Sequence, residues 1–270
     1  MVSYFKRLLK DYFSYVLMVG VVSTICIIIF LLPAEIGSML RARTQVFNPL
    51  TFISASFVHF DLIHLSNNLV AFIVVTYLLS FIHRQISEQK TLHISVLIIF
   101  TALPLLYYGF LFHFVFYASE VCGLSLVNSG LTGLSITSLT IYFKQRIEKI
   151  NSWLFLASII FFTSSFINLP KVSRCLLVIS GLVLGAREIK KVLLYLIPLW
   201  SKDKLEALIV VFTLLCYFIS LLALFPATII LGKGIVDIFA HYFGLLSGIS
   251  VGLITYFLKA RRNLGSFSLL

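Results

Sequence analysis

Residues 13–33 read FSYVLMVGVVSTICIIIFLLP, an apolar run that stops at Pro33. A helix needs roughly 20 such residues to cross the hydrocarbon core of a bilayer, so the run predicts a membrane-spanning helix. It lacks the small-x-small sequence that precedes a signal-peptide cleavage site, and we expect it to be retained.

Apolar runs continue along the whole chain. Hydrophobic residues make up 60% of the 270 residues and charged residues only 11%, whereas a soluble domain carries about a quarter charged residues. Lipid is the simplest cover for so much apolar surface. The sequence therefore predicts one all-α domain, 1–270, built as a polytopic transmembrane helix bundle. Its spans are expected at 13–33, 63–82, 92–117, 125–143, 152–169, 172–187, 205–227 and 235–258.

The sixth run, 172–187, is short for a complete crossing. It contains Gly181 and Gly185, and it predicts a half-helix or a re-entrant segment. Residues 188–200 mix charged with large apolar side chains, which is typical of an amphipathic segment at a membrane surface.

The basic residues indicate how the chain lies in the membrane. The net charge of +11 does not predict a nucleic-acid partner, because the basic side chains flank apolar runs and form no patch. With a cytoplasmic N-terminus and eight crossings, 16 of the 21 Lys and Arg residues fall on the cytoplasmic side. Cytoplasmic loops carry such an excess. We therefore expect an integral, multi-pass protein of the lipid bilayer with both termini cytoplasmic.

The cysteines stand singly in apolar surroundings, without the spacing of a metal site or a disulfide framework. We expect them to pack as small apolar side chains, and the sequence suggests no metal or other cofactor. They are Cys26, Cys122, Cys175 and Cys216.

Polar groups at membrane depth are costly, so each is a candidate functional residue. The run TFISASFVHFDLIHLSNN (51–68) contains His64 and ends at Asn68. These two residues are four apart and therefore share one face of the helix that begins there. Both can donate hydrogen bonds to a developing negative oxygen. Alone, they could equally be polar residues at a membrane interface.

A second candidate is GLS (123–125), at the start of an apolar run. Ser125 would lie at a helix N-terminus, where backbone N–H groups and the helix dipole favour an oxyanion. Alone, it could be a helix cap, and the following Gly130 and Gly133 could serve only helix packing.

A third candidate is AHYFGLLSG (240–248), in the last apolar run. Gly244 and Gly248 form a GxxxG face that lets another helix approach closely. If the helix that begins at Ser125 packs there, its hydroxyl comes within reach of His241. Histidine is the usual base that activates a serine near neutral pH. A dyad without a carboxylate is feasible where packing fixes the imidazole.

Together these stretches resemble the rhomboid family of intramembrane serine proteases. Residues 51–68 resemble its second-helix signature, 123–133 resemble its GxS motif with later glycines, and 240–248 match AHxxGxxxG. The resemblance implies a six-helix core. That core would comprise 13–143 and 205–258, with about two additional membrane segments within 152–200 inserted between core helices four and five.

The resemblance also implies a role for each candidate residue. Ser125 would be the nucleophile and His241 the general base. His64, Asn68 and the Ser125 backbone N–H, supported by Gly123, would hold the oxyanion. The helix-packing residues would be Gly130, Gly133, Gly244 and Gly248. The substrates would be transmembrane proteins, cut near the outer face of the membrane, toward which the site opens.

The sequence departs from the family pattern at two positions. The residue after the serine is usually glycine and is Leu126 here, and the position four after it is often aromatic and is Ser129 here. Ser129-Gly130 is therefore a rival nucleophile motif. We prefer Ser125 because Gly123 precedes it and the spacing of the later glycines fits it.

Two other functions stay open. A rhomboid-like pseudoprotease would bind membrane segments without cutting them. A transporter would use His64, His241 and Asp237 along a path through the membrane. The chain has no inverted repeat of the kind many transporters have, and the protease is the hypothesis we favour.

Overall fold

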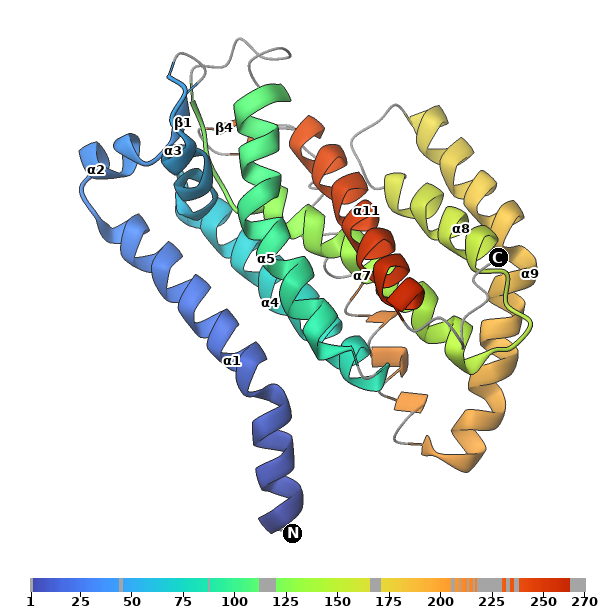
Figure 1. Cartoon of the computed structure of the whole chain (residues 1–270). Coiled ribbons are helices and arrows are strands. Elements are labelled where there is room, and N and C mark those ends of the chain that lie inside the picture. The colour runs from blue at the N-terminus through green and yellow to red at the C-terminus, as the bar shows by residue number, and fades with distance from the viewer. Residues whose placement is uncertain are drawn as a thin grey trace.

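The protein is seen here as a computed structural model that describes residues 2–43, 46–86, 88–111, 120–165, 171–204, 207–208, 210–212, 214–215, 217, 230–231, 234–235 and 238–262. These residues form a helical bundle with two short antiparallel ribbons (Figure 1). The helices are α1 (Val2–Leu31), α2 (Ala34–Met39), α3 (Pro49–Ser54), η1 (Ala55–Phe57), α4 (Leu62–Gln85), α5 (Gln89–Leu106), η2 (Tyr107–Leu111), α7 (Ser125–Arg146), α8 (Ser152–Ser164), α9 (Lys171–Lys202) and α11 (Ile238–Arg262). The ribbons pair β1 (Ala42–Arg43) with β2 (Glu120–Val121), and β3 (Ile230–Leu231) with β4 (Gly234–Ile235).

Within the part of the chain that the structure describes, four helices are long and apolar enough to cross a membrane. They are Phe13–Leu31, Leu62–Gln85, Gln89–Phe110 and Phe239–Lys259. The expectation of an all-α chain with apolar helices of membrane-spanning length is thus confirmed. Most of the predicted span 205–227 lies outside the described residues.

Helix α1 presents its apolar side chains outward. Phe13, Leu17 and Leu31 are 66%, 53% and 76% exposed, whereas Val22 and Cys26 are buried against the bundle. Large exposed apolar surface of this kind marks contact with something other than water. Lipid is the environment that fits such a helix.

Helix α7 lies at the centre of the bundle. Figure 1 shows it crossing between α4 and α5 on one side and α8 and α9 on the other. Its side chains from Leu126 to Thr140 are buried, although many are Ser or Thr. Thr132, Ser138 and Thr140 satisfy their hydroxyls by donating to the carbonyl four residues earlier. Protein side chains therefore surround this helix, which explains how it tolerates its polar residues.

Helices α7 and α11 pack closely and run parallel. A Cβ on Gly244 would lie 2.5 Å from the Leu126 carbonyl oxygen and 2.9 Å from the Ser129 Cβ. One turn further along both helices, a Cβ on Gly248 would overlap the Gly130 carbonyl. Gly133 in turn faces the backbone of Leu245 and Ile249. Only glycine permits this approach of backbones, as in small-residue packing of membrane helices.

Helices α8 and α9 form an antiparallel hairpin against α7. Gly181 and Gly185 pack on Ser158, whose hydroxyl donates to the Gly181 carbonyl at 2.8 Å. Helix α9 is continuous from Lys171 to Lys202, so the predicted division into a half-helix at 172–187 and a separate segment at 188–200 is wrong.

Helix α9 continues past Glu188 because the charge of this buried residue is paired. The Glu188 carboxylate is 1% exposed, accepts from the Asn151 backbone N–H at 2.8 Å and pairs with Lys191 at 2.8 Å. A buried carboxylate that is paired and hydrogen-bonded in this way can be accommodated within a helix.

We call the end of the bundle where α7 begins at Ser125 the site end, and the end where it finishes at Arg146 the far end. At the far end, the buried His83 ring lies 2.9 Å from the Ser138 hydroxyl and 3.1 Å from the Glu88 carbonyl. Lys259 of α11 pairs with the Glu88 carboxylate. These contacts connect α4, α7 and α11 with the residue that begins α5.

Candidate active site

Ser125 is the first residue of α7, and no side chain caps this helix. It is half-buried, whereas the residues that follow it are buried. The first N–H groups of a helix have no partner within the helix, and the helix dipole makes this end positive. An oxygen that gains negative charge beside Ser125 would therefore be stabilised.

Gly123 brings the chain into α7 through a conformation that favours glycine. Its φ is +122°, and its backbone N–H donates to the Ala55 carbonyl at 2.9 Å. A Cβ at this position would lie 2.7 Å from both Cε1 and Nε2 of His64. The His64 ring therefore packs directly against the backbone two residues before Ser125.

Asn68 lies one turn after His64 on α4 and is held by two neighbours. Its side-chain nitrogen donates to the His64 carbonyl at 3.0 Å. Asn128 of α7 donates to the Asn68 backbone carbonyl at 2.9 Å and to its Oδ1 at 3.3 Å. An amide nitrogen carries two N–H groups, so one remains for a ligand. The structure thus brings both predicted oxyanion residues to the start of α7.

His241 is 3% exposed and lies three residues before Gly244. Gly244 contacts the turn of α7 formed by Leu126 and Ser129. Because the helices run parallel with about 1.5 Å of rise per residue, stepping back one turn on each reaches His241 and Ser125 at the same level. The glycine seam therefore puts the predicted base and nucleophile on neighbouring turns.

Ser129 occupies a different environment. It is 0% exposed, its Cβ faces Gly244, and its hydroxyl has no hydrogen-bond partner among the described residues. A substrate carbonyl cannot approach a hydroxyl enclosed between two helices. This geometry favours Ser125 over the rival motif at Ser129-Gly130.

Cys122 is the other nucleophilic side chain close to Ser125. Burial raises the pKa of its thiol to about 12. Because the thiolate is the reactive form, this cysteine stays inert near neutral pH.

The described residues between 34 and 61, namely 34–43 and 46–61, form a platform that contacts the segment preceding Ser125. Strand β1 pairs with β2, with Ala42 opposite Val121 and Arg43 opposite Glu120. The Ser54 hydroxyl on α3 donates to the Leu40 carbonyl at 2.9 Å and so links two segments of the platform.

His59 belongs to the same platform and stands edge-on to His64, with ring centroids 5.0 Å apart. Burial lowers the pKa of the His59 imidazole from 6.5 to about 3, and the His64 ring acts in the same direction. The ring is therefore neutral near pH 7.

Two features of the site were not predicted. Asn128 is a polar residue in an apolar run, and that signal alone could have identified it. The pairing of Arg41 with Glu120 has no local signal, because 79 positions separate the two residues. Asp237 lies outside the described residues.

Comparison of the chain with protein-family models, with curated proteins and with solved structures gave no match.

Proposed function

We propose that this protein is an intramembrane serine protease of the rhomboid type, with Ser125 as nucleophile and His241 as general base. The observation that carries the proposal is the parallel glycine seam between α7 and α11. In the register of this seam, Ser125, at a helix N-terminus, and the buried His241 each lie about one turn before the contact of Ser129 with Gly244. His64 and Asn68 supply polar groups on the adjacent helix α4.

The reaction follows from these positions. His241 takes the proton from the Ser125 hydroxyl as the oxygen attacks a substrate carbonyl. The Ser125 backbone N–H, His64 and the second N–H of Asn68 stabilise the oxyanion. His241 returns the proton to the leaving amine, and an acyl group remains on Ser125. Water activated by His241 then releases the acyl group and restores the enzyme.

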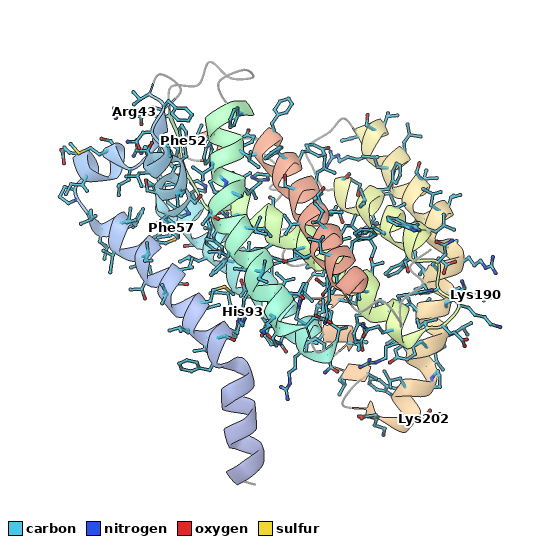
Figure 2. The ribbon with its side chains drawn as sticks, viewed as in Figure 1. Arg43, Phe52, Phe57, His93, Lys190 and Lys202 are labelled. Atoms are coloured by element: carbon cyan, nitrogen blue, oxygen red, sulfur yellow. The ribbon has the colours of Figure 1, made fainter. Side chains whose placement is uncertain are left out.

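We also propose an orientation and a substrate class. The site end faces the outer side of the membrane, both termini are cytoplasmic, and the substrates are transmembrane proteins unwound near the outer surface. Figure 2 supports this orientation because Arg43 lies at the site end, whereas Lys202 lies at the far end. The far end also carries Arg84, Lys144, Arg146, Lys149 and Lys259. Such an excess of Lys and Arg is typical of the cytoplasmic side.

Cleavage of a single-span protein in liposomes tests the proposal. We expect Ser125→Ala and His241→Ala to abolish cleavage and Ser129→Ala to retain it. Loss of the Ser129 hydroxyl removes a buried unsatisfied group and costs little stability. Cleavage by Ser125→Ala at the wild-type rate would refute the assignment.

The same liposomes distinguish the two other functions. A pseudoprotease would retain the single-span protein without cutting it in every variant. A transporter would carry solute at a rate that is unchanged in Ser125→Ala. Either result would replace the protease proposal.

A further inference from the structure

A cluster of charges ties the segment before Ser125 to the platform 34–61. We propose that Glu120 is a positioning residue for Ser125, holding the segment that leads to the nucleophile through Arg41 and Arg43. This inference rests on the proposed function of Ser125.

Each carboxylate oxygen of Glu120 has its own arginine. Arg41 Nη1 lies 2.9 Å from Oε2, and Arg43 Nη2 lies 3.1 Å from Oε1. With both oxygens engaged by different groups, the carboxylate cannot rotate without losing a contact. Its orientation, and that of the backbone that carries it, is therefore fixed.

The backbone on either side of this cluster is fixed as well. Glu120 pairs with Arg43 across the β1–β2 ribbon, and Gly123 donates to Ala55 at 2.9 Å. The stretch from Glu120 to Gly123 is thus held at both of its ends by the platform. Ser125 follows two residues later, so a shift of Glu120 is transmitted to the start of α7.

The cluster also reaches the oxyanion side of the site. The Arg41 guanidinium lies over the Phe60 ring, 4.7 Å from its centroid. The Phe60 and His64 rings stack with their centroids 6.4 Å apart. His64 is the ring that packs against Gly123. One set of contacts therefore orients both the nucleophile's segment and a proposed oxyanion donor.

The solvent exposure of these three side chains indicates that they position the segment more than they stabilise the fold. The side chains of Arg41, Arg43 and Glu120 are 21%, 45% and 28% exposed. Ion pairs that solvent reaches contribute little to stability. A displacement of a reacting group by about 1 Å, however, can cost about a hundredfold in rate. Loss of the Glu120 charge should therefore slow the chemical step more than it unfolds the protein.

The test compares Glu120→Gln with Glu35→Gln, which removes an exposed carboxylate from α2 in the same platform. Cleavage kinetics and the rate of Ser125 labelling by a fluorophosphonate are measured on the full-length protein in liposomes. We expect Glu120→Gln to lower kcat and the labelling rate about tenfold with an unchanged KM, because the nucleophile is misplaced. Glu35→Gln should behave as wild type, and both should keep the wild-type helical signal.

A charge exchange keeps the test decisive if a single variant folds poorly. Glu120→Arg should be slow, and combining it with Arg41→Glu and Arg43→Glu should restore the labelling rate, because the opposite charges face each other again. Wild-type kcat and labelling in Glu120→Gln, or a Glu120→Arg variant as fast as the wild type, would overturn the positioning role. Wild-type cleavage by Ser125→Ala would instead refute the proposed function on which it rests.

Discussion

Gly123 carries two constraints that no other residue type meets. Its φ of +122° disfavours side chains, and the space that a Cβ would fill is occupied by the His64 ring, 2.7 Å away. The glycine therefore lets His64, the proposed oxyanion donor, pack against the segment that leads to Ser125, the proposed nucleophile.

We expect Gly123→Ala to lose activity about a hundredfold, because the His64 ring and the chain before Ser125 must both move. Backbone strain of this kind costs about 1–3 kcal/mol, so stability should fall as well. Cleavage rate and denaturant unfolding in detergent measure the two effects. Wild-type activity in this variant would mean that the close approach of His64 has no functional role.

His59 makes stability depend on pH. Its folded-state pKa is about 3 against an ordinary value of 6.5. Above pH 6.5 the imidazole is neutral in both folded and unfolded chains. Between the two values only the unfolded chain binds the proton, so stability is lost as the pH falls.

We therefore expect wild-type protein to lose more stability between pH 7.5 and pH 4.5 than His59→Phe, which keeps a ring but cannot titrate. His93→Phe, at an exposed position on α5, serves as the control and should follow the wild type. Unfolding midpoints at the two pH values give the answer. Equal losses in wild type and His59→Phe would contradict the buried neutral state of His59.

The sequence predicts which residues belong to the candidate site better than it predicts the contacts between them. His64, Asn68 and Ser125 are identifiable because polar groups are rare in apolar runs. The contact of Asn128 with Asn68 joins residues 60 positions apart, and nothing in either run specifies it.

Among the elements, α7 and α11 decide whether the site forms. Their contact follows from glycines that the sequence displays, Gly130 and Gly133 on one helix and Gly244 and Gly248 on the other. The parallel direction and the register emerge only when the helices are packed. Helix α9 was less predictable, because the buried Glu188 carboxylate is paired with the partly exposed Lys191, which lets charges lie within a continuous helix.

Gly248→Ala tests the seam, and Gly20→Ala is its matched control. A Cβ on Gly248 would overlap the Gly130 carbonyl, whereas one on Gly20 of α1 would meet no described residue within 4 Å. We expect Gly248→Ala to cost about 1–3 kcal/mol of stability, as overpacked cores do, and to lower activity by separating Ser125 from His241.

Gly20→Ala should keep activity and gain up to about 1 kcal/mol, because alanine favours helix. Unfolding in detergent and the cleavage assay measure both variants. Equal behaviour of the two would show that α7 and α11 do not approach through this seam.

For the whole molecule, composition predicts a helical membrane bundle because lipid is the only plausible cover for so much apolar surface. The proposed sidedness rests on where the basic residues gather. An impermeant thiol reagent tests it in intact cells, in a chain whose exposed Cys175 is replaced by Ser. We expect Met39→Cys, on α2, to react from outside, and Lys202→Cys, at the end of α9, only after lysis. The reverse pattern would invert the proposed orientation.

The central claim is that Ser125 is activated by His241 across the α7–α11 seam. The most direct measurement is fluorophosphonate labelling of the protein in liposomes, with the modified peptide identified by mass spectrometry. We expect one adduct, on Ser125, that disappears in His241→Ala. An adduct on Ser129, labelling that is unchanged in His241→Ala, or no adduct at all in the wild type would contradict it.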